Sequence, residues 1–160
     1  MKPRVLNNGR LPPGLLARLA ADHALTTLAE QADPAAHLAA HGSDYEALVT
    51  SAAVGADAAL LASLPRLKVI SSFGVGLDKI DLAAARARGI AVGYTPDVLN
   101  DCVADTAWGL LIDVARGFSA ADRFVRSGQW PQGPYPLGRK VSGARLGIVG
   151  MGRIGRSIAQ

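Results

Sequence analysis

Short apolar runs alternate with helix-compatible stretches along roughly the first hundred residues. The apolar runs lie at 2–6, 24–28, 47–50, 67–72 and 90–94, and the helical patterns between them lie at 13–21, 33–42, 56–64 and 81–89. Strands that are joined through helices form βαβ units, whose strands run parallel. The pattern therefore predicts an α/β domain with a parallel sheet at residues 1–98.

Local turn chemistry supports the ends of these helices. Asp33 and Asp81 each precede a helical pattern, where a carboxylate can accept hydrogen bonds from free backbone N–H groups. Gly42 and Gly89 follow two of the patterns, which is the usual place for a residue that leaves a helix. Pro65 is expected to stop the helix predicted at 56–64.

The pattern changes after residue 98. One long helix is predicted at 101–116, capped by Asn100 or Asp101, and a second helix is predicted at 119–127. The long helix is apolar over most of its circumference, so it is expected to be buried on several sides.

Prolines and glycines dominate the next segment. Three of each fall within 128–138, which predicts an extended arm or loop. A new apolar strand is predicted at 146–149. We therefore divide the rest of the chain into a crossing helix with an arm at 99–143 and the first strand and helix of a second domain at 144–160.

A glycine-rich turn follows the last predicted strand. Gly150, Gly152 and Gly155 have the G-x-G-x-x-G spacing that opens a Rossmann dinucleotide-binding domain. The first glycine permits a sharp turn, the second lets the backbone approach a pyrophosphate, and the third permits close packing of helix and strand. Arg153 and Arg156 add positive charge at the helix start. The alternative is a glycine-rich turn that binds nothing.

Charge and cysteine content narrow the classes of function. The net charge is +4, and from Arg116 onward eight basic residues accompany one acid, Asp122. This excess fits a solvated face, the phosphates of a cofactor or an acidic partner. Nucleic-acid binding is disfavoured, because no aromatic platform accompanies the scattered basic residues. With one cysteine and no long apolar segment, we expect a cytoplasmic protein without disulfides, a metal site or a membrane span.

Two longer stretches resemble one family. The segment LKVISSFGVGLDKIDLAAARARGIAVGYTPDVLNDCVADTAWGLLIDVAR and its continuation SGARLGIVGMGRIGRSIAQ resemble the D-isomer-specific 2-hydroxyacid dehydrogenases. Within that family they look most like the glyoxylate/hydroxypyruvate and hydroxyphenylpyruvate reductases. The resemblance implies a flavodoxin-like substrate domain, then a helix that crosses into a Rossmann domain. It also implies a homodimer that reduces a small 2-ketoacid with NADPH or NADH, with NADP slightly favoured.

The resemblance also implies roles for individual residues. Val75 and Gly76 would donate backbone N–H groups to the substrate carboxylate, although the same residues fit an ordinary strand-to-helix turn. Val103 would face the cofactor, although inter-domain packing explains it equally well. The residues expected to bind the dinucleotide are Gly150, Gly152, Arg153, Ile154, Gly155 and Val103.

The family's catalytic groups do not map onto these 160 residues. In the family an arginine, a glutamate and a histidine act on the substrate, and all three follow the glycine-rich turn. The acidic residue about 20 positions after the turn, which favours NAD, cannot be placed either. We therefore expect the chain to correspond to the N-terminal half of such an enzyme. The alternative is a non-catalytic flavodoxin-like module that binds a partner or dimerises.

Other reactive side chains are not assigned to catalysis. Cys102 is expected to be a small packed residue, since no histidine is placed to pair with it. His23, His37 and His41 are expected at the surface or in packing.

Overall fold

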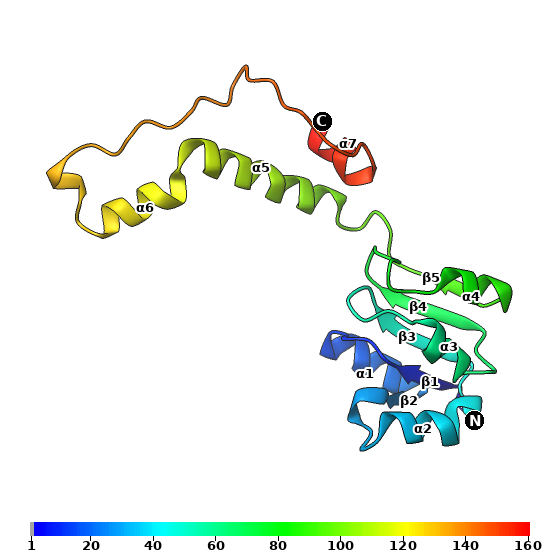
Figure 1. Cartoon of the computed structure of the whole chain (residues 1–160). Coiled ribbons are helices and arrows are strands. Elements are labelled where there is room, and N and C mark those ends of the chain that lie inside the picture. Colours follow the sequence, from blue (N-terminus) through cyan, green and yellow to red (C-terminus); the bar gives the residue numbers. More distant parts are fainter. Residues whose placement is uncertain (1) are drawn as a thin grey trace. The chain divides into compact units, whose positions relative to one another are not determined.

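The computed structural model describes residues 2–160, and these residues form two compact units. Unit 1 extends through Pro96, and unit 2 is Asp97–Gln160. Figure 1 shows the elements of both units along the chain.

Unit 1 is built on a five-stranded parallel sheet in the order β2-β1-β3-β4-β5. This order is that of the flavodoxin-like fold, so the predicted fold class is confirmed. The strands are β1 (Arg4–Asn7), β2 (Ala24–Thr27), β3 (Ala47–Ser51), β4 (Val69–Phe73) and β5 (Ala91–Gly93).

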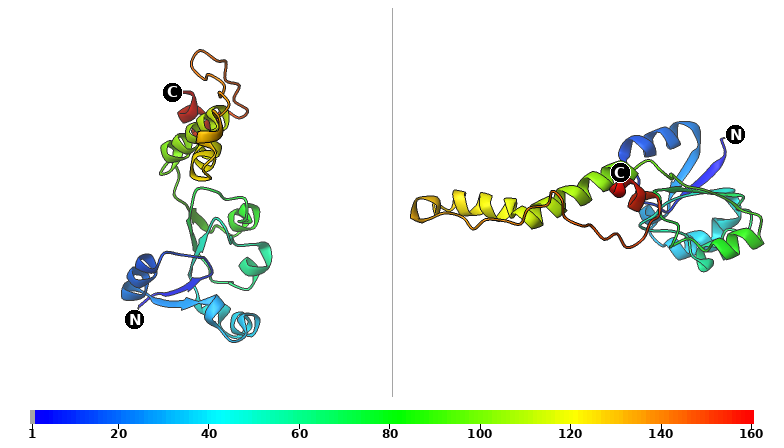
Figure 2. Two further views of the ribbon diagram at one scale, coloured as in Figure 1. Left: turned by 90° about the vertical axis from the view of Figure 1, so that its left-hand side faces the viewer. Right: turned by 90° about the horizontal axis from the view of Figure 1, so that it is seen from above.

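Helices cover the two faces of this sheet unequally. α1 lies on one face, and α2, α3 and α4 lie on the other (Figure 2). The helices are α1 (Pro13–Asp22), α2 (Pro34–His41), α3 (Ala58–Ala62) and α4 (Leu82–Ala87), with short 3-10 turns at η1 (Leu28–Glu30) and η2 (Gly42–Asp44).

The core of unit 1 lies between the sheet and the helices α2, α3 and α4. Leu6, Leu48 and Ile70 are fully buried on adjacent strands, and they pack with Leu61 and Leu64 from the α3 region. Their alternation with residues of the other face follows from the two-residue period of a strand. This rigid layer fixes where the loops at the ends of the strands begin.

The predicted caps of unit 1 are confirmed where local chemistry decides them. Asp33 accepts hydrogen bonds from the N–H groups of the first turn of α2, and Asp81 accepts one from Ala84 at 2.8 Å. Gly89 follows α4 with a φ of +67°. The helix predicted at 56–64 is shorter than expected, because Asp57 caps it through Leu60 N–H and the preceding residue forms a parallel bridge instead.

Unit 2 is mostly helical. Its elements are α5 (Asn100–Arg116), α6 (Phe118–Arg126), the 3-10 turn η3 (Trp130–Gln132) and α7 (Arg153–Ala159). Gly117, with a φ of +68°, separates α5 from α6. Neither Asn100 nor Asp101 caps α5 as predicted, because both lie inside the helix and Leu99 holds the cap position without a side-chain hydrogen bond.

Two further predictions for unit 2 are wrong. Residues 146–149 form no strand, since no other segment of the described part of unit 2 offers a backbone edge for pairing. Helix α5 is not buried on several sides: Ala104 is its one buried residue, whereas Leu110 and Val114 are 61% and 86% exposed. The apolar pattern of the sequence shows how much apolar surface α5 has, but it does not show which residues cover that surface.

Side-chain contacts hold the helices of unit 2 together. Trp108 of α5 donates its indole N–H to the carbonyl of Ile158 in α7 at 3.0 Å. At the other end of α5, the ring of Tyr135 meets Phe124 edge-on, with centroids 5.4 Å apart. Within the described residues, no helix combines the length and the apolar character that a membrane span needs.

Candidate functional site

The carboxyl ends of β1, β3 and β4 bring three loops to one edge of the unit 1 sheet. The parallel register pairs Ser51 with Phe73, so β3 and β4 end together, and it pairs Asn7 with Val49, so β1 ends two residues earlier. Gly9 lies tightly against β3, since a Cβ at this position would fall 2.5 Å from the carbonyl carbon of Thr50. Ligands of open parallel sheets bind at this edge.

Gly74 fixes the path of the chain after β4. It has a φ of +134°, and a Cβ on it would lie 2.7 Å from the Cβ of Ala52 in the loop after β3. Its N–H donates to the Thr95 hydroxyl at 3.2 Å, and its carbonyl accepts from Thr95 N–H at 3.0 Å. Sequence reasoning missed this role, although the glycine of the quoted FGVG stretch was its signal.

Val75 and Gly76, the predicted carboxylate-binding residues, follow directly. Both are half-buried, and neither N–H donates a hydrogen bond to another of residues 2–160. Two consecutive amides without a protein acceptor can bind an anion. The Asp78 carboxylate lies close by, with one oxygen 3.3 Å from where a Gly76 Cβ would stand. The loop therefore offers two N–H donors to an anion, and the negative charge of Asp78 disfavours anion binding there.

The glycine-rich turn of unit 2 (residues 150–155, the fingerprint turn) has the backbone that its sequence predicts. Gly150 has a φ of +94° and makes the sharp turn. A Cβ on Gly155 would stand 2.1 Å from the Gly150 carbonyl oxygen, so only glycine lets α7 pack this close. At Gly152 the space is open, with no atom within 4 Å of an added Cβ.

Charge at the fingerprint turn comes from the start of α7. Arg153 is the first residue of the helix, and the N–H groups of a first helical turn have no intrahelical acceptor. Its Nε lies 3.1 Å from a carboxylate oxygen of Asp97. The open space at Gly152, the amides of the first helical turn and the guanidinium are the features with which helix starts bind a pyrophosphate.

The other predicted cofactor residues occupy less distinctive positions. Ile154 is half-buried in the first turn of α7. Val103 lies near the start of α5, with about a third of its side chain exposed. The structure brings Gly150, Gly152, Arg153, Ile154 and Gly155 together in one turn. Val103 lies on α5, which is hydrogen-bonded to α7 on both sides of it, through Asp101 with Ser157 and through Trp108 with Ile158.

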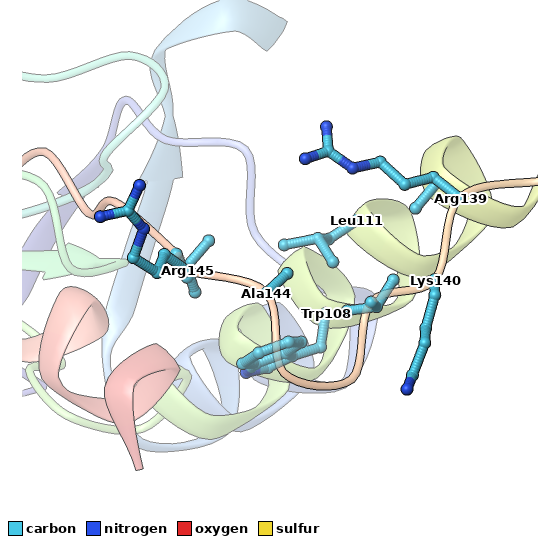
Figure 3. A pocket seen from close by; sticks show the side chains of 9 residues that line it. Trp108, Leu111, Arg139, Lys140, Ala144 and Arg145 are labelled. Atoms are coloured by element: carbon cyan, nitrogen blue, oxygen red, sulfur yellow. The ribbon is translucent and has the colours of Figure 1, made fainter.

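Unit 2 also has a hollow that was not expected from the sequence. It encloses about 220 Å³ between α5 and residues 139–146. Figure 3 shows Trp108, Leu111 and Ala144 along it, with the charged ends of Arg139, Lys140 and Arg145 directed to different sides. The basic groups do not converge, so the hollow is not an anion site.

The remaining candidate side chains have structural partners. His37 shares a hydrogen bond with the Tyr45 hydroxyl at 2.7 Å, and His41 lies 3.4 Å from Asp44. Cys102 is exposed rather than packed, and its thiol donates to the Leu99 carbonyl. Among residues 2–160, no group of three or more metal-ligating side chains is arranged to hold a metal ion.

Comparison with known proteins identifies the family. The family described as "D-isomer specific 2-hydroxyacid dehydrogenase, catalytic domain" matches residues 9–149. The chain belongs to this family. The fingerprint turn and the carboxyl edge of the sheet therefore lie in a chain of this family, and the family is NAD(P)-dependent.

Named relatives agree with this assignment. The chain is 50% identical over 123 residues to a glyoxylate/hydroxypyruvate reductase from Arabidopsis thaliana, and 46% identical over 123 residues to a hydroxyphenylpyruvate reductase from Plectranthus scutellarioides. Each alignment covers 77% of this chain and 39% of the relative.

Solved structures are similar over nearly the whole chain. A 2-hydroxyacid dehydrogenase from Ketogulonicigenium vulgare is 42% identical with a TM-score of 0.93, covering 99% of this chain and 50% of that one. An NADPH-dependent glyoxylate/hydroxypyruvate reductase from Sinorhizobium meliloti, solved with NADP and malonate, is 38% identical with a TM-score of 0.83, covering 99% and 49%. The chain thus spans half or less of the length of these relatives.

Proposed function

We propose that this protein reduces a small 2-ketoacid to the D-2-hydroxyacid with NAD(P)H. The observation that carries the proposal is the fingerprint turn, where Gly155 is required by the chain's own packing and Gly152 is not. The open space at Gly152, at the start of α7, leaves room for a pyrophosphate to approach the backbone. Membership of the 2-hydroxyacid dehydrogenase family points to the same chemistry.

We assign the chain's segments accordingly. Residues 1–98 form the substrate domain, residues 99–143 the crossing helix and arm, and residues 144–160 the first part of the dinucleotide-binding domain. NADP(H) is the favoured cofactor, since one similar reductase is described as NADPH-dependent and was solved with NADP. Hydroxypyruvate, glyoxylate and arylpyruvates are the favoured substrates, because the named relatives are reductases of these compounds.

The chain's own residues have two tasks in this scheme. The amides of Val75 and Gly76 hold the substrate carboxylate, and the half-buried loop limits its freedom to rotate. The first amides of α7, with Arg153, hold the pyrophosphate. A bound nicotinamide supplies the hydride. No residue among 2–160 is assigned as the acid or base that transfers the proton.

Assembly and location belong to the same proposal. We assign a homodimer, which the family resemblance implies, and we assign the arm at 128–138 to its interface. A cytoplasmic location suits the single exposed cysteine, because disulfides are rare in reducing compartments.

Gly152→Ala is the sharpest test of cofactor binding. The φ and ψ of Gly152 are −74° and −159°, which alanine can adopt, and nothing in the described chain would contact the new Cβ. Stability should therefore be unchanged. NADPH affinity should fall by about tenfold or more, because the methyl group occupies the space through which the pyrophosphate approaches the backbone.

Gly147→Ala is the matched control, since an added Cβ there also has open space. It should change neither stability nor NADPH affinity. Binding is measured by fluorescence titration of NADPH and NADH, followed by oxidation assays with hydroxypyruvate, glyoxylate and 4-hydroxyphenylpyruvate. Equal dinucleotide affinity in wild type and Gly152→Ala, or no turnover of any 2-ketoacid by the full-length protein, would refute the proposal. The latter result with intact binding would favour the non-catalytic module.

A further inference from the structure

Asp97 has an unusual backbone conformation. Its φ of +68° lies in the left-handed region, and no other non-glycine residue among 2–160 has a positive φ. L-residues adopt this region at a cost, although aspartate and asparagine tolerate it better than most. Asp97 is also the first residue of unit 2.

The Asp97 carboxylate has two partners within unit 2. One oxygen accepts a hydrogen bond from the side-chain amide of Asn100 at 3.0 Å, which holds the carboxylate against the start of α5. The same oxygen lies 3.1 Å from Nε of Arg153. The left-handed backbone and the Asn100 amide thus direct a negative charge onto the arginine of the fingerprint turn.

The Asp97–Arg153 pair is accessible to solvent. The side chains are 58% and 53% exposed, so water and small anions reach both groups. Exposed ion pairs are weak, because water screens them and ordering two side chains costs entropy. A phosphate, with more charge and more acceptor oxygens than a carboxylate, can therefore displace Asp97 from the guanidinium.

We propose that Asp97 competes with the dinucleotide pyrophosphate for Arg153. In the unbound protein the carboxylate holds the guanidinium, and cofactor binding transfers Arg153 from Asp97 to a phosphate. Asp97 thereby lowers cofactor affinity and makes Arg153 selective for ligands that carry enough negative charge to displace it. This inference rests on the proposed function, because the competing ligand is the dinucleotide of that site.

Asp97→Asn isolates the charge. Asparagine adopts the left-handed region as readily as aspartate, and its side-chain oxygen can still accept from Asn100. The variant should bind NADPH roughly two- to fivefold more tightly at low salt, the range expected for loss of one exposed ion pair. The gain should shrink as salt screens the competing charge. Equal or weaker NADPH binding by Asp97→Asn would overturn the competition.

Two comparisons separate the pair from a general charge effect. Asp122→Asn removes the same charge from an exposed Asp–Arg pair of α6, in which Asp122 accepts from Arg126 Nε at 2.9 Å. It should change NADPH affinity less than twofold. In an Arg153→Gln background, Asp97→Asn should also change affinity less than twofold, because its competitor's target is gone. A full gain in that background would show that Asp97 acts on the ligand directly and would overturn the proposal.

Inorganic pyrophosphate is the second probe, because it supplies the phosphate charge without nucleoside or nicotinamide. Calorimetric titration of all variants of the full-length protein gives three distinguishable results. NADPH binding that Asp97→Asn leaves unchanged refutes the competition and not the proposed function. Pyrophosphate binding that Asp97→Asn tightens, without binding of either dinucleotide, supports the competition and refutes the proposed function. Binding of neither probe by any variant refutes both.

Discussion

Gly9 lies where the loop after β1 meets β3, and replacing it tests how closely the carboxyl edge of the unit 1 sheet is packed. A Cβ on Gly9 would stand 2.5 Å from the carbonyl carbon of Thr50 and 2.7 Å from the amide nitrogen of Ser51. Both are backbone atoms of a buried central strand, so no side chain can move aside to admit the methyl group. Overpacking of this kind costs typically about 1–3 kcal/mol. Gly9→Ala is therefore expected to destabilise unit 1 by at least about 1 kcal/mol.

Gly14→Ala provides a control of opposite sign. Gly14 lies in α1, and an added Cβ there has no atom within 4 Å. Alanine in a helix is favoured over glycine by up to about 1 kcal/mol, largely because it restricts the unfolded chain. Urea unfolding followed by circular dichroism gives the two free-energy changes. Hydrogen–deuterium exchange of peptides covering β1 and β3 shows whether the Gly9→Ala effect is local.

Stability of Gly9→Ala equal to that of wild type would refute the close packing of Gly9 against β3. Loss of exchange protection away from β1 and β3 would refute it as well. Destabilisation by both alanines would point instead to a general intolerance of substitution in unit 1, since nothing in the structure opposes a methyl group at Gly14.

Three further changes have defined outcomes. Gly155→Ala should weaken NADPH binding and lower the hydrogen-exchange protection of α7, because its Cβ would stand 2.1 Å from the Gly150 oxygen, where at least 3.0 Å is needed. Unchanged exchange protection of α7 would contradict this packing. Gly76→Val should raise the ketoacid KM and leave the NADPH affinity unchanged. Equal effects on both would argue against binding of the substrate carboxylate by the amides of Val75 and Gly76. Hydrogen bonds from the Ser119 hydroxyl and amide hold the pKa of Asp113 below its usual range. The Asp113 carboxylate therefore stabilises the corner between α5 and α6 fully at pH values above the ordinary aspartate pKa. This stabilisation is lost as the pH falls through the lowered pKa of the folded protein. Exchange protection of α6 should follow that titration in wild type and not in Asp113→Asn.

Prediction from sequence succeeded where a few neighbouring residues decide the structure. Asp33 and Asp81 cap their helices because the acceptor and the N–H groups it binds are two or three residues apart. The alternation of strands and helices predicted a parallel sheet, and the family resemblance implied the flavodoxin-like fold whose strand order the structure has. The predicted start of α3 at residue 56 was too early. Asp57 caps this helix within a few residues of sequence, whereas the bridge that takes Ala56 out of the helix joins it to the distant Ile80.

Prediction failed where the answer depended on what lies opposite a segment. Residues 146–149 have the composition of a buried strand, yet a strand exists only through its hydrogen-bonded neighbour, and Val149 is fully exposed. The apolar stripe of α5 was read as burial, yet Leu110 and Val114 face solvent in the described chain. The contact between Asp97 and Arg153 joins residues far apart in sequence, and no local signal marks it.

The two glycines at the start of α7 show how a structure refines a motif. In the sequence, Gly152 and Gly155 are equivalent parts of one spacing, and a turn that binds nothing could account for both. In the structure, Gly155 is explained by packing alone, since its Cβ would overlap the Gly150 carbonyl. Gly152 is not explained by packing, because alanine would fit its backbone and its surroundings. Open space alone does not distinguish Gly152, because Gly14 and Gly147 have it too; what distinguishes Gly152 is its place at the start of α7 within the glycine spacing of a dinucleotide site. Substitution of Gly152 therefore separates ligand binding from folding, whereas substitution of Gly155 changes both.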